Sequence, residues 1–412
     1  MISFRHATVL PGTGADPVED ATVVVEGTII QDILTSTRAG ARVSGEVIDC
    51  GGRTLMPGLI DAHVHVCALD VDMSAQRRTY PTSLMAYAIG KTIRETLDQG
   101  FTTIRDAGGA DWGMKEAVDR GLIPGPRMFV SGHPLSQSGG HGDPRTRAEN
   151  YAGCDCGSAI GMVPNIADGV DEVRRAVRTQ LRRGADQIKV MAGGGVASPT
   201  DRLESVQYRP DELGAAVAEA QAAGTYVLAH AYTPQAIRFA VEAGVRSIEH
   251  GNFLDDATAE LMAAKGTFLV PTFVTYEKLH EHGGERGLTP AQLAKLDLVL
   301  GSGLDGLRRA HMAGVRIGSG SDLLGDLARY KTRELTIKAS VIGPHAALVA
   351  TTKTNAELLG IGDEVGTIET GKRADLLVVD GDPLANIGLL QDQDNLLAIV
   401  KAGEIYKHQI GG

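Results

Sequence analysis

The chain has 412 residues, of which 43% are hydrophobic and 22% are charged, an ordinary composition for a globular protein. Its formal net charge of -11 argues against binding to a nucleic-acid backbone and favours solubility. No opening segment resembles a signal peptide, and no apolar run is long enough to span a bilayer. We therefore expect no membrane partner, and either a cytoplasmic protein or one exported with a leader outside this sequence. The length suits a barrel of about 250 residues plus an accessory module.

The four cysteines are Cys50, Cys67, Cys154 and Cys156. The stretch Cys154-Asp-Cys156 fits either a pair of soft-metal ligands or a strained disulfide. Because no second cysteine pair stands at zinc-site spacing, we expect reduced thiols with structural roles.

Short apolar runs separated by turns fill both ends of the chain. Examples are residues 21–25 and 47–49 near the start, and residues 374–380 near the end. This pattern is typical of strands and hairpins. The simplest arrangement pairs residues 1–56 with residues 357–412 in one small β-sandwich.

Between these ends, strand-like runs alternate with stretches of helical periodicity, which indicates a parallel sheet. Several of the expected helices are followed by a glycine, as suits a helix C-terminus. The four helices so expected are 85–99, 169–183, 210–223 and 234–243, followed by Gly100, Gly184, Gly224 and Gly244. The eight strand candidates are Leu59–Val66, Thr102–Asp106, Arg127–Ser131, Gln187–Met191, Tyr226–His230, Ser247–His250, Thr267–Pro271 and Val315–Gly318.

Eight strand–helix units predict an α/β fold, a (β/α)8 TIM-like barrel over residues 57–356. Catalytic groups in such barrels sit at the C-terminal ends of the strands. Six candidates lie there. His63 and His65 share one face of the first strand, because side chains two residues apart on a strand point the same way. The remaining four follow along the chain at later strands: Lys189, His230, His250 and Asp322.

Each of these residue types has a chemical reason to be at a metal site. Neutral imidazole and carboxylate suit borderline divalent metals, zinc above all. A buried lysine must be paired or lose its proton. Carbamylation by CO₂ gives Lys189 an anionic group long enough to bridge two cations. Two metals roughly 3.5–4 Å apart would then hold a hydroxide and polarise a carbonyl.

Taken singly, each residue has a plainer interpretation. A strand-end histidine is more often structural, Lys189 would more often pair with a buried acid, and Asp322 would simply cap a helix. All six at one predicted rim is improbable by accident, so we predict a metal site.

The stretch Pro57-Gly-Leu-Ile-Asp-Ala-His-Val-His65, together with Lys189, His230, His250 and Asp322, resembles the binuclear-metal amidohydrolase superfamily. The closing stretch 366–383 is also typical of it. The resemblance implies His63 and His65 on the more buried metal and His230 and His250 on the more exposed one. It implies N6-carboxylysine at Lys189 as the bridge and two divalent ions, zinc above all. Asp322 would bind the buried metal and shuttle the proton.

Within that superfamily the chain is similar to Xaa-Pro and Xaa-Arg dipeptidases, the prolidase-like carboxypeptidases, and to ochratoxin-hydrolysing amidohydrolases. The stretches that carry this similarity are 103–109, 139–143, 188–195 and 230–232. The similarity implies a small-molecule amide or dipeptide substrate and a homo-oligomer, such as an octamer.

The expected reaction is amide hydrolysis by a hydroxide that bridges two metals. Tyr232 would donate a hydrogen bond to the carbonyl oxygen as its charge develops. Asp322 would take the proton from the nucleophile and give it to the leaving amine. By resemblance, His141 would bind the carboxylate of the leaving amino acid, or else it is a loop histidine facing water. Arg145 and Arg202 are both candidates to assist it.

The glycine-rich stretch 193–198 lacks the Lys-Ser/Thr ending of a phosphate-binding loop, so we interpret it as a flexible rim loop. Two rival functions stay open. One is a cyclic amidase or lactonase of the same superfamily, which would keep the bridging lysine, whereas deaminases usually lack it. The other is a non-catalytic binding homologue, which would be expected to have lost metal ligands.

Overall fold

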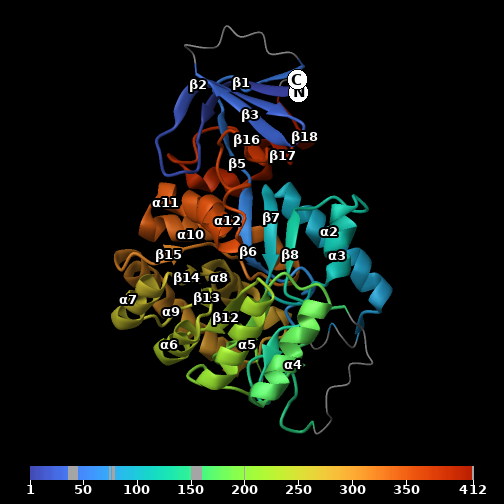
Figure 1. The fold of residues 1–412 in the computed structure, drawn as a ribbon, viewed down its shortest axis with the longest axis vertical. Coiled ribbons are helices and arrows are strands. Elements are labelled where there is room, and N and C mark those ends of the chain that lie inside the picture. The colour runs from blue at the N-terminus through green and yellow to red at the C-terminus, as the bar shows by residue number, and fades with distance from the viewer. Residues whose placement is uncertain (36–44, 74–75, 77–78, 150–159, 199, 411–412) are drawn as a thin grey trace.

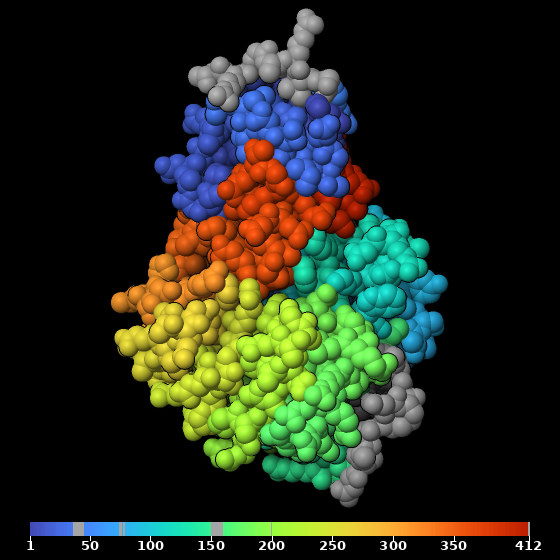
Figure 2. Space-filling model, viewed as in Figure 1, coloured from blue at the N-terminus to red at the C-terminus, as the bar shows by residue number. Residues whose placement is uncertain are grey.

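The computed structural model describes residues 1–35, 45–73, 76, 79–149, 160–198 and 200–410. The predicted thiols Cys154 and Cys156 fall outside these ranges, whereas Cys50 and Cys67 are buried and free. A barrel of parallel strands surrounded by helices carries a smaller β-sheet at one end (Figure 1). In the space-filling view, the N-terminal and C-terminal segments, blue and red, pack against each other at that end (Figure 2).

The smaller sheet is built from both ends of the chain, as predicted. Its described strands form one mixed, hydrogen-bonded sheet in the order β18-β17-β16-β5-β1-β2-β3, with β4 also paired to β1. The two halves join where β16 runs antiparallel to β5. The strands are β1 (Ile2–Val9), β2 (Val18–Glu26), β3 (Ile29–Leu34), β4 (Glu46–Asp49), β5 (Thr54–Pro57), β16 (Leu376–Val379), β17 (Leu396–Lys401) and β18 (Glu404–His408).

Strand β16 is apolar throughout because both of its faces are covered. Leu376 and Val378 enter the core of the small sheet, with Phe4 among its members. Leu377 and Val379, on the opposite face, enter the core that includes Ile93 and other residues of the barrel. The alternation with a period of two thus attaches the small sheet firmly to the barrel.

The barrel wall matches the sequence prediction closely, since every predicted strand overlaps an observed one. Two short strands, β9 and β10, were not predicted. Those described are β6 (Leu59–Val64), β7 (Phe101–Asp106), β8 (Arg127–Val130), β9 (Leu135–Ser136), β10 (Asn165–Ile166), β11 (Ile188–Met191), β12 (Val227–Ala231), β13 (Ser247–His250), β14 (Phe268–Val270) and β15 (Arg316–Ile317).

The strands pair in two parallel sheets, β6-β7-β8 and β10-β9-β11-β12-β13-β14-β15. Backbone hydrogen bonds link these sheets at both seams. Asp186 N donates to Val130 O over 2.8 Å, and Ala62 N donates to Ser319 O over 2.9 Å. The wall is therefore continuous around the barrel.

Helices cover the outside of the barrel, and the four that the sequence predicted are α2, α4, α5 and α6 (Figure 1). The start and stop signals act as expected. Thr233 caps the N-terminus of α6, and Gly244 ends it with a left-handed φ of 92°. The described helices are α2 (Thr82–Asp98), α3 (Trp112–Asp119), α4 (Gly169–Arg182), α5 (Pro210–Ala222), α6 (Pro234–Ala243), α7 (Asp256–Lys265), α8 (Phe273–His282), α9 (Pro290–Met312), α10 (Arg333–Ile342), α11 (Pro344–Val349) and α12 (Asn355–Leu359). Among the described residues, none of these helices has the length and apolar character needed to cross a membrane.

Candidate metal centre

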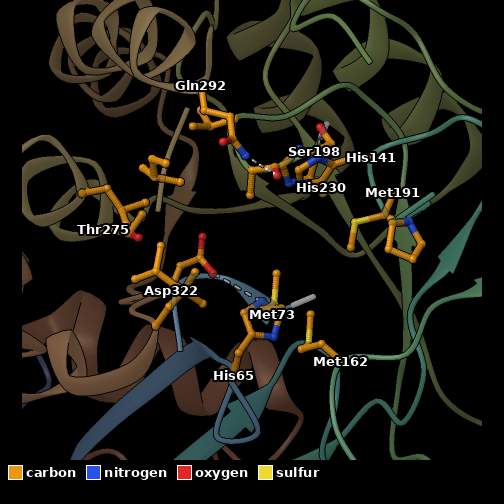
Figure 3. A pocket seen from close by; sticks show the side chains of 18 of the residues that line it. His65, Met73, His141, Met162, Met191, Ser198, His230, Thr275, Gln292 and Asp322 are labelled. Carbon is orange, nitrogen blue, oxygen red and sulfur yellow. Dashed lines mark hydrogen bonds and ion pairs between the residues drawn. The ribbon is translucent and has the colours of Figure 1, made fainter. Parts of the chain in front are cut away.

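The predicted metal ligands, Tyr232 and His141 all lie around one cavity of about 330 Å³ at the C-terminal ends of the barrel strands. The strands themselves bring them together. Parallel pairing sets Met191 beside His230 and Ala231 beside His250, so successive strand ends deliver neighbouring side chains. The residues concerned are His63, His65, His141, Lys189, His230, Tyr232, His250 and Asp322. His65 and Asp322 lie on one side of the cavity, opposite His141 and His230 (Figure 3).

The Asp322 carboxylate is the common neighbour of three imidazoles. Its Oδ1 lies 3.5 Å from His63 Nε2 and 3.3 Å from His65 Nε2, and its Oδ2 lies 3.9 Å from His250 Nδ1. His63, His250 and Asp322 each offer a ligand atom within 4.8 Å of the others. The His230 and His250 rings are 4.5 Å apart between centroids. This donor set is the one that zinc and similar ions prefer.

Each imidazole is held by a hydrogen bond through one nitrogen, which leaves the other nitrogen for a ligand. His65 Nδ1 is 2.8 Å from the Gly108 carbonyl, and His250 Nδ1 is 2.8 Å from Thr272 Oγ1. His230 is instead held through Nε2, 3.0 Å from the Gly194 carbonyl. Outer-shell bonds of this kind fix the ring orientation and the tautomer of metal-binding histidines.

His63 is held by the most buried ion pair of the site. Its Nδ1 lies 2.7 Å from Glu249 Oε2, and both Glu249 oxygens accept from Arg105 Nη2, at 2.8 and 2.9 Å. Arg105 and Glu249 are both 0% exposed. Meanwhile His63 Nε2 is buried without any hydrogen-bond partner. An orphaned nitrogen of this kind is costly unless something occupies the space before it, so it fits a metal ligand well.

The backbone at the rim is constrained in a way that aims the ligands. His250 and Asp322 adopt left-handed φ values of 74° and 52°, unusual for residues with a side chain. The loop that carries Asp322 is tied to β6, because Ser321 N and Oγ both donate to the Asp61 carboxylate, at 3.0 and 2.6 Å. Such strain is found where function demands a particular geometry.

The electrostatics of the cluster keep most imidazoles uncharged. Burial, followed by the charge of Lys189, lowers the pKa of His63 well below its usual value. Burial also lowers the pKa values of His230 and His250 well below theirs. Burial opposes charge on His65 too, but the Asp322 carboxylate raises the pKa of that ring. Burial alone would raise the pKa of Asp322, yet His63 and His65 bring it below normal. Neutral imidazole and ionised carboxylate are the forms that bind metals.

Lys189 is buried at the centre of this group. Burial lowers the pKa of its amine to about 8. An appreciable fraction of the amine is therefore neutral near pH 7, and the neutral amine is the form that can react with CO₂.

Tyr232 is backed by a second tyrosine. The Tyr276 hydroxyl donates to the Tyr232 oxygen over 3.0 Å, so the proton of Tyr232 stays available for another acceptor. Burial raises the pKa of Tyr232, which keeps its hydroxyl protonated. The position suits a hydrogen-bond donor to a substrate oxygen.

His141 packs in the cavity wall with its ring stacked on His230, 4.2 Å between centroids. Its Nδ1 lies 2.9 Å from Ser198 Oγ. Burial lowers the pKa of its imidazole to about 4, and the Asp201 carboxylate only partly opposes this. The glycine-rich stretch beside it, which we interpreted as a flexible rim loop, lies at the cavity rim and makes close contacts with neighbouring segments. Gly194 N donates to Ser205 O over 3.0 Å, and a Cβ at Gly195 would overlap the His141 ring.

The two predicted arginines do not line the cavity, whereas a different one does. Arg145 bonds to Asp143, and Arg202 is paired with Glu204 at an exposed position. Arg286, from the 3-10 turn η2 (Gly284–Arg286), lies in the cavity wall and is held by Asp326 at 2.9 Å. No sequence pattern marks Arg286, because only the fold of the segment after α8 brings it to the rim. Arg105 and Glu249 were also missed, although a charged residue inside a strand that is expected to be buried is a usable signal.

Comparison with known proteins identifies the family to which the chain belongs. Residues 54–406 match the Amidohydrolase family. The chain is 33% identical to the ochratoxinase of Aspergillus niger, over 97% of this chain and 85% of that protein. It is 42% identical to a prolidase solved in complex with N-methylphosphonate-L-proline, with a TM-score of 0.95 over 99% of this chain and 100% of the other. A Xaa-Pro dipeptidase structure is 29% identical, with a TM-score of 0.87 over 98% and 99%. The match over most of its length, with the strand-end residues described above, shows that the chain belongs to the amidohydrolase family and is a hydrolase.

Proposed function

We propose that the protein hydrolyses the amide bond of N-acyl amino acids or dipeptides, in the manner of a carboxypeptidase or dipeptidase, and that ochratoxin A is among its substrates. The observation that carries this proposal is the buried group of imidazoles around Asp322, with Lys189 lining the same cavity. The relatives named ochratoxinase, prolidase and Xaa-Pro dipeptidase support the same substrate class.

The residues fit two divalent ions, zinc above all. His63 and His65 would hold the more buried ion, and His230 and His250 the more exposed one, with carbamylated Lys189 between them and Asp322 on the buried ion. The unpartnered Nε2 of His63 and the lowered pKa of Lys189 support this assignment. When bound, such ions lower the pKa of a water and polarise the substrate carbonyl.

The chain's own groups would manage the protons. Asp322 is ionised and opens to the cavity, with 20% of its side chain exposed, so it can accept a proton from the attacking water. It would then return that proton to the leaving amine. Tyr232, with its proton free, would stabilise the charge that develops on the carbonyl oxygen.

The rest of the cavity supports an apolar substrate with an anionic end. Methionine, leucine and valine side chains line much of the wall, and Figure 3 shows Met73, Met162 and Met191 facing into it. Its size falls at the lower end for small-molecule sites, which suits an N-acyl amino acid or a dipeptide. His141 and Arg286, which both line the cavity, would meet a substrate carboxylate. A carboxylate at His141 would itself favour the protonated ring.

The test is a panel of N-acyl amino acids and dipeptides with the leaving residue varied, run beside lactones and cyclic imides. We expect hydrolysis of the first group only, abolished by a chelator and restored by zinc. His141→Ala should raise KM for substrates with a free carboxylate. Turnover of lactones or cyclic imides alone would replace this proposal by the cyclic amidase or lactonase function. A chain that takes up no added zinc would favour the non-catalytic alternative.

Size-exclusion chromatography with light scattering would test the homo-oligomer that we also propose.

A further inference from the structure

The loop between β11 and α5 carries two side chains that meet His141. Ser198 Oγ lies 2.9 Å from His141 Nδ1, and the same hydroxyl forms a hydrogen bond with Asp201. Both Ser198 and Asp201 are buried. The side chains of Asp201, Ser198 and His141 therefore form a continuous line of hydrogen bonds that ends in the cavity wall. We call these three side chains the relay.

The direction of these bonds follows from counting protons. Oδ2 of Asp201 accepts from Gly195 N at 3.1 Å and from Gln207 Nε2 at 3.0 Å, while Oδ1 is the oxygen bonded to Ser198. The acceptors beside Ser198 Oγ are the Asp201 carboxylate and, at 3.2 Å, the Gly195 carbonyl, and neither can donate. The carboxylate is the nearer of the two, so the single hydroxyl proton of Ser198 points to Asp201. Ser198 must then accept from His141, which places a hydrogen on Nδ1. Nε2 is the ring nitrogen left to bind a ligand.

The same proton count excludes a second hydrolytic centre of the serine type. In such a centre the imidazole takes the proton of the serine. Here the imidazole donates to Ser198 and the serine donates to Asp201, so His141 cannot activate this hydroxyl as a nucleophile.

A lysine from α9 holds the loop in this shape. Lys295 Nζ donates to the carbonyls of Gly195 at 3.0 Å and Asp201 at 2.7 Å, and lies 3.4 Å from Asp201 Oδ1. One turn earlier, Gln292 Nε2 donates to the Ala197 carbonyl over 2.7 Å. The ammonium both balances the buried carboxylate and closes the loop around it, so hydrogen bonds within the protein hold these side chains in place.

We propose that Ser198 and Asp201 are positioning residues for substrate recognition, with Lys295 as their anchor. They hold the His141 ring so that the N–H at Nδ1 donates to Ser198 and Nε2 faces the substrate. Nε2 would take up a proton when it meets the leaving residue's carboxylate, since a bare ring nitrogen can only accept a hydrogen bond. That role of Nε2 rests on the proposed function, whereas the orientation and tautomer of the free ring do not. The relay would therefore set KM rather than the chemical step.

The experiment uses Ser198→Ala, Asp201→Asn and Ser198→Thr, with Arg202→Ala as the matched control from the same loop. The Arg202 side chain is exposed and lies outside the cavity wall. Kinetics are measured on the best N-acyl amino acid of the panel and on its C-terminal amide. We expect Ser198→Ala to raise KM for the acid about tenfold, the effect of one hydrogen bond to a charged group, with kcat within about twofold. KM for the amide should stay unchanged, and Ser198→Thr should restore the wild-type KM.

A readout independent of turnover keeps the two proposals apart. Nitrogen-15 NMR of histidine-labelled protein, with His141 assigned by its absence in His141→Ala, reports which ring nitrogen carries the hydrogen. We expect hydrogen on Nδ1 in the wild type and in Arg202→Ala, and a mixture of tautomers in Ser198→Ala. If these tautomers were found but no substrate of the panel with an amide bond were hydrolysed, the proposed function would be rejected and the proposal for Ser198 and Asp201 would stand. A His141 resonance unchanged by Ser198→Ala, or an unchanged KM in a variant of normal metal content and melting temperature, would overturn the relay.

Discussion

Glu249→Gln tests how far the metal centre depends on the buried ion pair behind it. Glu249 accepts from Ser247 Oγ at 2.6 Å, holds His63 Nδ1 at 2.7 Å and faces Arg105 with both oxygens. Glutamine has nearly the same shape but carries no charge. Because both oxygens bond to the same guanidinium nitrogen, either orientation of the new amide sets an NH₂ donor against Arg105.

The expected cost follows from burial. The change strands the Arg105 guanidinium, which is 0% exposed, without its counter-charge. Breaking a fully buried pair by removing one partner destabilises proteins by about 3–5 kcal/mol. The weakened hold on His63 Nδ1 should also lower metal affinity by about 10- to 100-fold, as loss of an outer-shell partner does.

Two measurements separate these effects. Thermal or urea unfolding of the metal-free protein gives the loss of stability, and competition with a chelator gives the metal affinity. Glu116→Gln is the matched control, since it breaks the exposed Glu116–Arg120 pair on α3 and should cost no more than about 0.5 kcal/mol. If Glu249→Gln resembled this control in both measurements, the ion pair would not support His63 and our reasoning about the site would be wrong.

Three further substitutions test the remaining roles. Asp322→Asn should reduce kcat by about 10²–10⁴, because the proton acceptor is lost, while metal analysis shows a content near normal; an unchanged kcat would remove Asp322 from proton transfer. Tyr232→Phe should lower kcat about 100-fold with little change in KM, as expected for a donor that acts in the transition state, and steady-state kinetics would show otherwise if it only bound substrate. Lys189→Met should lower the metal bound per chain below that of the wild type, measured by elemental analysis, and equal content in both proteins would contradict a bridging carbamate.

Local pattern was sufficient for most of the barrel. Runs such as 268–270 are buried on both faces and therefore apolar, and glycines such as Gly184 end helices because only glycine adopts their left-handed φ cheaply. The strands β9 and β10 were missed because two residues each give no period to detect. For β16 and β5, by contrast, the sequence predicted that the two ends of the chain pair but not the register of the pairing. That register depends on the two hydrophobic cores on either face of β16.

The residues around the cavity divide in the same way. Those at predictable strand ends, such as His230 and His250, were found because parallel strands bring their ends to one rim. Residues that support the site through contacts across the barrel were not predicted. Glu249 and Arg105 are 144 positions apart, and neither has a local pattern that names the other. Arg145 was a reasonable candidate from its loop, but the neighbouring Asp143 binds it first.

The most direct test of the central claim is a crystal structure of the zinc-loaded protein with anomalous diffraction measured at the zinc edge. We expect two anomalous peaks in the cavity, one beside His63 and His65 and one beside His230 and His250, with electron density for a carbamate on Lys189 between them and Asp322 at the buried peak. A Lys189 side chain directed away from these residues, or an absence of peaks at full zinc loading, would contradict the account.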